Sequence, residues 1–234
     1  MHLRSLVAAG RDLVLGEDCA GGCGAPATLL CPRCAAEMTP RPRRVHPRGA
    51  PAGMPATTAA AAYEGAVRRA IVAYKEHGRR ALADQLAGLL AASIRAATGD
   101  RPLLLVPIPS RRSTTRSRGH DAMAGIVRSA QALLPGVTVR PLLVHARRVA
   151  DQGGLSLAQR RANLDGALRV SGARPALRGR QVVLVDDVCS SGATLAAAAD
   201  ALLHAGVTHE APGGLVAAVV AAPPPRARVP RPWT

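Results

Sequence analysis

The sequence predicts an α/β fold in which a mostly parallel β-sheet is covered by helices on both faces. Three segments, Leu103–Ile108, Val182–Val185 and Leu215–Val220, are continuous apolar runs that do not alternate with polar residues. Runs of this kind are typical of parallel strands that are buried on both faces. Segments with helical spacing lie between them, and strands that alternate with helices indicate a layered α/β domain.

The helices are predicted from the spacing of apolar side chains. Val67, Ile71 and Tyr74 recur four and three positions apart, which predicts a helix that starts near Tyr63 and is ended by Gly78. Other segments complete the expected domain: helices over Ala81–Ala97, Ala122–Leu134 and Ala193–His204, and a strand over Thr138–Val144.

The chain of 234 residues is long enough for one such domain and a small appendage. Residues 1–40 hold four closely spaced cysteines, and residues 41–61 are rich in proline and arginine and are interpreted as a linker. The main domain is predicted over residues 62–222, with a mobile polar excursion at Arg147–Asn163. Residues 223–234 form a Pro/Arg-rich tail that we expect to be disordered.

The formal net charge is +16, and 30 of the 31 basic residues are arginines, with Lys75 the only lysine. Such a charge could serve binding to nucleic acid or to polyanionic metabolites, or could reflect a biased composition, because the arginines are scattered. With 1% aromatic residues, the chain offers few rings on which bases could stack. No apolar run is long enough to span a membrane, and the start is a poor signal peptide, so we expect a cytoplasmic protein without membrane insertion.

The most informative segment is Gln181–Leu195, QVVLVDDVCSSGATL. A buried strand ends in the carboxylates of Asp186 and Asp187, and a loop of small residues leads into an alanine-rich helix. Ligands bind beyond the carboxyl ends of strands in open α/β sheets, and backbone N–H groups at a helix start suit a phosphate. The carboxylates repel phosphate and suit vicinal hydroxyls, as on a ribose, or a coordinated Mg²⁺. The predicted phosphate contacts are Ser190, Ser191, Gly192, Ala193 and Thr194.

A second half-site is predicted after Leu103–Ile108. The segment VPIPSRR leaves this strand and turns at once into Ser110, Arg111 and Arg112. Two prolines stiffen the turn, and an arginine can meet a diphosphate with paired N–H donors. A basic surface turn without a ligand would look the same in the sequence.

The Gln181–Leu195 segment resembles the phosphoribosyl pyrophosphate (PRPP) motif of type I phosphoribosyltransferases. From Tyr63 onward the chain resembles one subgroup, the ComF family of competence protein F and GntX-like proteins. The matching pieces are AYEGAVRRAIVAYKEHGRRALA (Ala62–Ala83), VPIPSRR…RSRGHDAMA (Val106–Ala124), GLSLAQRRANLDGAL (Gly154–Leu168) and VVLVDDVCSSGATL (Val182–Leu195).

The resemblance implies a type I phosphoribosyltransferase fold over residues 62–222 and Mg²⁺ bound together with PRPP. It implies that Asp186 and Asp187 hold the ribose hydroxyls, that the loop after them holds the 5′-phosphate, and that Ser110 and the arginines after it hold the pyrophosphate. Three positions depart from the family: Cys189 stands where a branched aliphatic residue is usual, and His120–Asp121 replaces an aromatic–Asn pair.

The excursion Arg147–Asn163 falls where these enzymes have a catalytic hood. Its Gln152, Arg160, Arg161 and Asn163 match the family pattern, and Arg160 is the candidate that would close over the diphosphate. An arginine there would stabilise negative charge on the leaving group and exclude water. A solvated helix cap is the alternative interpretation of this motif.

Cys19, Cys23, Cys31 and Cys34 form two close pairs, with spacings of three and two residues inside the pairs. Such spacings fit a structural Zn²⁺, and a cytoplasmic setting argues against disulfides. The ComF family commonly carries an N-terminal zinc finger with two residues in the first pair, and here Gly21–Gly22 lengthens that pair by one. Free or redox-paired cysteines are the alternative.

These observations predict a ComF-like protein that binds PRPP with Mg²⁺ and transfers the phosphoribosyl group to an acceptor that the sequence does not identify. The alternative is a non-catalytic accessory protein of DNA uptake in natural competence, with single-stranded DNA or DNA-uptake proteins as partners and a regulatory PRPP site. The resemblance implies both roles.

Overall fold

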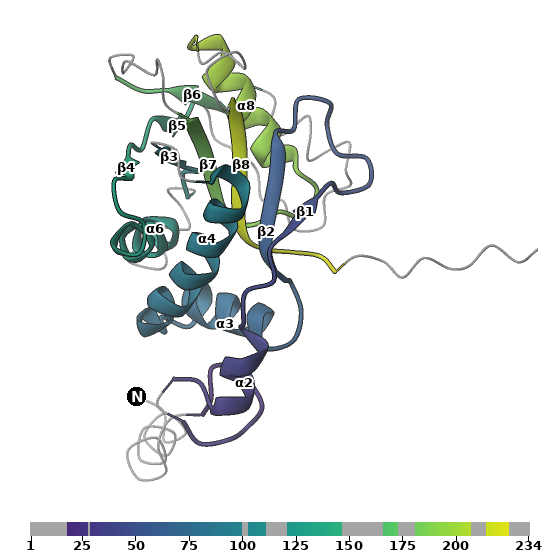
Figure 1. Cartoon of the computed structure of the whole chain (residues 1–234), viewed down its shortest axis with the longest axis vertical. Helices are drawn as coiled ribbons and strands as arrows, with labels where there is room; N and C mark the ends of the chain where they lie inside the picture. The colour runs from purple at the N-terminus through teal and green to yellow at the C-terminus, as the bar shows by residue number, and fades with distance from the viewer. Residues whose placement is uncertain are drawn as a thin grey trace, which may run out of the picture.

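The structure is a computed structural model that describes residues 18–27, 29–99, 103–110, 121–146, 166–172, 181–206 and 214–224. Its centre is a six-stranded sheet with strand order β1-β2-β8-β7-β3-β4 (Figure 1). Neighbours from β2 to β4 pair in parallel, and β1 pairs with β2 in antiparallel fashion. The strands are β1 (Arg43–Val45), β2 (Ala56–Ala62), β3 (Leu103–Pro107), β4 (Thr138–Val139), β7 (Gln181–Val188) and β8 (Leu215–Ala222).

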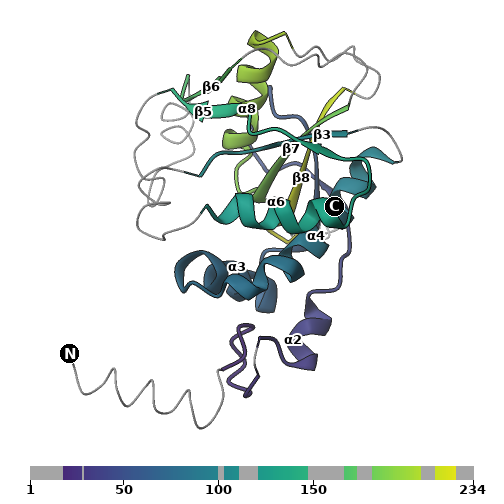
Figure 2. The same cartoon turned by 90° about the vertical axis from the view of Figure 1, so that its left-hand side faces the viewer.

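Helices lie on both sides of this sheet, as Figures 1 and 2 show. One side carries α3 (Gly65–Glu76), α4 (Ala83–Thr98) and α6 (Ala122–Ala132), and the other carries α8 (Ala193–His204). Successive side chains of β3 enter the two cores in turn: Leu105 packs with the α3–α4–α6 side, and Leu104 with the α8 side. Because both faces are covered, β3, β8 and residues 182–185 of β7 are apolar, and the predicted fold class is confirmed.

The predicted helices and the three apolar strands agree with the structure to within a few residues at their ends. The prediction of a single strand over Thr138–Val144 is wrong, because two strands occupy this part of the chain. Its start is β4 of the central sheet, and its end is β5 (Leu143–His145), which pairs with β6 (Leu168–Val170) in a separate antiparallel sheet. Pro141 has no N–H for the sheet ladder, which explains a break at this point.

The segment 41–61 differs from the linker expected there, because it contributes β1 and β2 to the central sheet. The sequence of β2, ATTAAAA, has weak strand propensity, so it gave little local signal. Its stability comes from the fold: β2 pairs along its length with β8, and Ala59 and Ala60 are fully buried. Ala60 faces the α4 side, where its small side chain allows α4 to lie close to the sheet, and Ala59 faces the α8 side.

The N-terminal part that the structure describes contains a short helix, α2 (Pro32–Glu37), and lies beside α3 (Figure 1). A 3-10 turn, η1 (Arg80–Leu82), joins α3 to α4. None of the helices in the described ranges combines the length and the apolar character needed to cross a bilayer. The excursion at 147–163 and most of the tail at 223–234 lie outside the described residues.

Candidate functional site

The two carboxylates predicted for the site lie near the carboxyl end of β7, which pairs with β3 on one side and β8 on the other. Asp186 and Asp187 are half-buried, and the backbone N–H of Asp187 donates to Oδ1 of Asp186 across 2.9 Å. A loop of four residues, Cys189–Gly192, then leads into α8. We call this loop together with the first turn of α8 the phosphate loop, residues 189–194.

The phosphate loop enters α8 through a left-handed glycine. Gly192 caps α8 with φ +76°, a left-handed conformation that favours glycine. A Cβ at this position would collide with Sδ of Met54, which packs against the loop. Oγ of Ser191 accepts a hydrogen bond from the N–H of Ala193 at 3.4 Å. The loop therefore presents N–H groups and hydroxyls at the positive end of a 12-residue helix.

The side chains of the phosphate loop differ in their access to solvent. Ser190 is exposed, Ser191 and Thr194 are half-buried, and Ala193 is buried. Cys189 is buried in the core on the α8 side, where burial and the nearby charge of Asp186 raise the pKa of its thiol to about 11. A protonated, packed thiol is not a nucleophile, so Cys189 acts as a small core residue.

Lys75 is the residue of this site that sequence reasoning missed. It projects from the last turn of α3, and its ammonium contacts Oδ2 of Asp187. The two side chains are 28% and 15% exposed, so the ion pair is only partly screened by water. The available signal was that this lysine stands alone in a chain whose other cations are arginines.

The charges of this cluster are coupled. Burial, and then the negative charge of Asp187, raise the pKa of Asp186 to about 7, and Lys75 partly opposes that rise. Asp186 is therefore partly protonated near neutral pH. A cation or a hydrogen-bond donor that approaches this carboxylate favours its ionised form. Vicinal hydroxyls of a ribose are such donors.

The turn after β3 is described as far as Ser110. Oγ of Ser110 donates to Oδ1 of Asp121 at 2.9 Å, and the same oxygen accepts from the N–H groups of Met123 and Ala124. Asp121 is thus the N-cap of α6, a role in which Asp and Asn are about equivalent, so this departure from the family pattern keeps the capping function. Nε2 of His145 donates to the carbonyl of Pro109 at 3.2 Å and ties the turn to β5.

The other predicted contacts of the diphosphate, Arg111 and Arg112, and the hood residue Arg160 lie outside the described residues. Gln152, Arg161, Asn163 and His120 lie there as well. The described structure therefore brings together the ribose and 5′-phosphate half of the predicted site, with Lys75 added to it.

The four N-terminal cysteines converge as the spacing predicted. The sulfur atoms of Cys19, Cys23, Cys31 and Cys34 all lie within 4.8 Å of one another. Four thiolates at the ~2.3 Å Zn–S distance would have sulfur atoms about 3.8 Å apart, so this donor set fits a tetrahedral zinc ion with small adjustments. Burial and the neighbouring thiols raise the pKa of Cys34, and a central cation would offset that cost.

Gly21 and Gly22, which lengthen the first cysteine pair, have defined roles in this cluster. A Cβ on Gly21 would overlap Cys34, and Gly22 has φ +68°. The carbonyl of Gly21 accepts a hydrogen bond from Nε of Arg69 on α3. The inserted residue therefore permits the close approach of the thiols and connects the cluster to the main domain.

Helix α3 joins the cysteine cluster to the carboxylates. Near its first turn, the N–H of Ala66 donates to the carboxylate of Glu37 from α2 at 2.9 Å, so Glu37 replaces the missing side-chain cap of Glu64. Ala66 also packs with Cys19 and Cys34 in a small core. The other end of the same helix carries Lys75 to Asp187.

A comparison with family models finds one match to part of this chain. The model named phosphoribosyl transferase domain matches residues 122–231, which contain β7, the phosphate loop, α8 and β8. Together with the parallel sheet and the geometry of the site, this match supports a domain of the type I phosphoribosyltransferase family in this part of the chain. No curated protein matches this chain.

Proposed function

We propose that this protein is a ComF-like phosphoribosyltransferase that binds PRPP with Mg²⁺ and transfers the phosphoribosyl group to an acceptor. The observation that carries the proposal is the strand–loop–helix at β7 and α8, where two carboxylates at a strand end precede a phosphate loop at a helix start. This arrangement offers hydrogen-bond acceptors to a ribose diol and donors to its 5′-phosphate.

The donor set also suits Mg²⁺ that arrives with the diphosphate of PRPP. Sites of this kind hold Mg²⁺ through one or two carboxylates together with substrate phosphates. The contact of Lys75 with Asp187 supports this proposal, since the carboxylates already have one cation beside them. When bound, Mg²⁺ would neutralise charge on the pyrophosphate that leaves.

The chain's own residues would hold the sugar while the bond between C1 and pyrophosphate breaks. Asp186 and Asp187 would orient the hydroxyls, and their negative charge would stabilise the positive charge that develops on the ribose. The acceptor supplies the electron pair for the new bond at C1 and loses its proton, and pyrophosphate leaves with the electrons of the old bond. Ser110, Arg111, Arg112 and Arg160 are the proposed contacts of the leaving group.

Calorimetry with PRPP and Mg²⁺ tests the binding part of this proposal. Asp187→Asn keeps the size of the side chain and removes its charge, so PRPP affinity should fall at least ~10-fold, about 1.4 kcal/mol, as expected for a lost charge-assisted hydrogen bond. Asp186→Asn should behave alike. Asp200→Asn, an exposed position on α8, is the matched control.

Wild-type affinity in both Asp186→Asn and Asp187→Asn would refute ribose binding at these carboxylates. Pyrophosphate release in the presence of a panel of nucleobases and other acceptors tests transfer. Release that depends on both PRPP and an acceptor is expected. Binding of PRPP without release under any acceptor would favour a regulatory PRPP site over an enzyme.

The second candidate, binding of single-stranded DNA in an accessory role, rests on the exposed side chains of Arg41 and Arg44. Arg43 contributes less to such a surface, because its guanidinium donates to carbonyl groups of the chain itself. DNA affinity should then fall steeply with salt, and neutralising Arg41 and Arg44 together should reduce the salt slope. A salt slope unchanged in that double variant would exclude this surface.

We propose further that Cys19, Cys23, Cys31 and Cys34 hold one structural Zn²⁺. The convergence of their sulfur atoms supports this proposal. The ion would fix the segment that caps α3, and through α3 the position of Lys75.

A further inference from the structure

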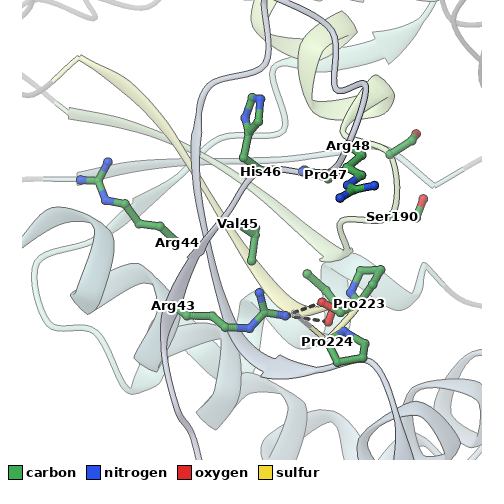
Figure 3. Close-up of a pocket in the computed structure, with 11 residues that line it drawn as sticks. Arg43, Arg44, Val45, His46, Pro47, Arg48, Ser190, Pro223 and Pro224 are labelled. Carbon is green, nitrogen blue, oxygen red and sulfur yellow. Dashed lines mark hydrogen bonds between the residues drawn. The ribbon is translucent and has the colours of Figure 1, made fainter. Parts of the chain in front are cut away.

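A pocket of about 520 Å³ lies between β1 and the phosphate loop (Figure 3). Residues 43–48 form one wall, Ser190 and Ser191 form the other, and residues 222–224 at the end of β8 complete it. We call this space the β1 pocket. Its volume falls in the range of ~300–1,000 Å³ that is typical of small-molecule sites, and it is much larger than one phosphate group requires.

In the described part of the chain, two of the three arginines that line the β1 pocket direct their guanidinium groups into it. Figure 3 shows the guanidinium groups of Arg43 and Arg48 directed into the β1 pocket, and Ser190 lies in the other wall of that pocket. Nη2 of Arg43 donates to the carbonyls of Ala222 and Pro223 at 3.1 and 2.5 Å, which holds the side chain in place while its charge remains. The guanidinium retains further N–H groups for a ligand.

Arg44 belongs to the same wall of the pocket, but its guanidinium is not directed into the space. Residues of a strand alternate between its faces, and Val45, on the same face as Arg43, packs in the core on the α8 side. Arg44 is exposed, and its guanidinium points away from the pocket (Figure 3). The strand therefore offers a natural pair of arginines, one directed inward and one outward.

The residues that line the β1 pocket favour an anionic ligand that is bound through its phosphate groups. Among the described residues that line the pocket, none is acidic, and none is Phe, Tyr or Trp. Guanidinium groups match phosphate oxygens in paired fashion, and the hydroxyls and N–H groups of the phosphate loop add further donors. Without these aromatic side chains, there is no large ring on which a base could stack.

We propose that the β1 pocket binds an oligophosphate, a chain of at least two linked phosphates, with one phosphate at Ser190 and Ser191 and the next between Arg43 and Arg48. The ligand could be a nucleoside triphosphate or an inorganic chain, since both present the same groups. The proposal extends the phosphate loop of the proposed function toward β1. Because the same serines cannot hold two phosphates at once, the oligophosphate competes with the 5′-phosphate of PRPP.

Calorimetry on the full chain tests this proposal, with inorganic tripolyphosphate as the probe, orthophosphate as the reference and no added Mg²⁺. Tripolyphosphate should bind at least ~10-fold more tightly than orthophosphate, and Arg48→Gln should weaken it by ~10-fold, as for the loss of one paired guanidinium contact. Arg44→Gln removes the same charge from the outward face and should leave the affinity unchanged. Arg48 is exposed, and circular dichroism of both variants verifies the fold.

Two results would overturn the proposal: tripolyphosphate affinity retained in Arg48→Gln, or equal losses in Arg48→Gln and Arg44→Gln, which would mean a general effect of charge. A parallel titration with ATP distinguishes the sources. ATP that binds as tightly as tripolyphosphate supports a nucleotide as ligand, and weaker ATP binding supports an inorganic chain. ATP binding without tripolyphosphate binding contradicts recognition through phosphates.

The failure of the oligophosphate site can be distinguished from the failure of PRPP binding. Asp187→Asn should weaken PRPP and leave tripolyphosphate binding intact, because Asp187 is not among the residues of the β1 pocket. Tripolyphosphate binding that fails while PRPP binds with a dependence on Asp187 refutes only the oligophosphate site. Loss of tripolyphosphate affinity in Asp187→Asn would place that ligand at the carboxylates and overturn its assignment to the β1 pocket.

Discussion

The cysteine cluster and the candidate site formed by Asp186, Asp187 and the phosphate loop are assembled in different ways. All four thiols of the cluster come from one short segment, Cys19–Cys34, and the turn between them places the sulfur atoms together. The candidate site also starts from one segment, Gln181–Leu195, but its counter-ion comes from α3, 112 positions away from Asp187 in the chain. Local spacing is sufficient to define the first kind of site, whereas the second is complete only after the sheet and α3 have packed.

The two regions are nevertheless connected through α3. The beginning of this helix is capped by Glu37 and packed against the cysteines, and its last turn carries Lys75. A change in the cluster should therefore reach the carboxylates through one rigid helix, and each of the following predictions tests how far the regions act separately.

The largest effect is expected for Cys34→Ser. Purified wild-type protein should contain about one zinc ion per chain, and the variant should lose most of it, because a structural site needs four ligands. Zinc binding in small domains contributes ~10–16 kcal/mol, so residues 18–38 should lose protection from hydrogen exchange. Metal analysis and exchange mass spectrometry measure both effects.

Cys189→Ser is the control, since Cys189 is buried in the core on the α8 side and should leave the zinc content unchanged. Wild-type protein that lacks zinc after purification without chelators would end the zinc hypothesis. Loss of exchange protection confined to the cluster, with α3 unaffected, would show that the two regions are independent.

The second prediction concerns the phosphate loop alone. Gly192→Ala places a Cβ at a left-handed position and against Met54, so it should destabilise the protein by about 2–3 kcal/mol. Gly206→Ala, at the other end of α8, has the same backbone cost with open space around it and should cost about 1–2 kcal/mol. Urea unfolding measures both. Equal losses would mean that Met54 moves aside and the loop is not tightly held.

Much of this molecule could be predicted from the sequence, and the failures share a physical cause. Apolar runs and helical periodicity located β3, β7, β8 and the four longer helices, because burial on a defined face leaves a direct trace in the residue pattern. The strand β2 is not evident from the sequence because five of its seven residues are alanine, which is depleted in strands, and its place depends on pairing with β8.

The candidate site shows the same division. The placement of Asp186 and Asp187 at a strand end, and of the phosphate loop at a helix start, could be predicted because the motif is contiguous. The positions of Lys75 and Arg48 could not be predicted. Nothing in the local sequence indicates that Lys75 reaches Asp187 from α3, or that Arg48 lines the β1 pocket from the segment after β1. The prolines and arginines of residues 41–61 predict a linker, although residues 43–48 of this segment form a wall of the β1 pocket.

The third prediction concerns the pH dependence of PRPP binding. The pKa of Asp186 is raised to about 7, so its fraction ionised grows from pH 6 to pH 8, and affinity for the ribose hydroxyls should rise roughly five- to ten-fold. Asp186→Asn should keep only the shallower dependence that comes from the phosphates of the ligand. A profile identical in wild type and Asp186→Asn would contradict this assignment.

The stability of the unliganded protein should change in the opposite direction. Because the folded pKa of Asp186 lies above its ordinary value of 3.8, folding is favoured by proton binding. Its stabilising contribution is fully present below about pH 4 and is lost as the pH rises through about 7. Urea unfolding of wild type and Asp186→Asn between these limits measures the contribution as a difference.

The smallest effect is expected for Lys75→Gln. Lys75 lowers the pKa of Asp186, so its removal should move the binding profile to higher pH. PRPP affinity should then fall by about three-fold at pH 7 and return toward the wild-type value near pH 8.5, where Asp186 is ionised in both proteins. A loss that is equal at all pH values would mean that Lys75 contacts PRPP directly instead of acting through the carboxylates. Cys34→Ser provides a comparison. If zinc holds α3 in place, this metal-free variant should show the same upward shift in the pH profile of PRPP binding.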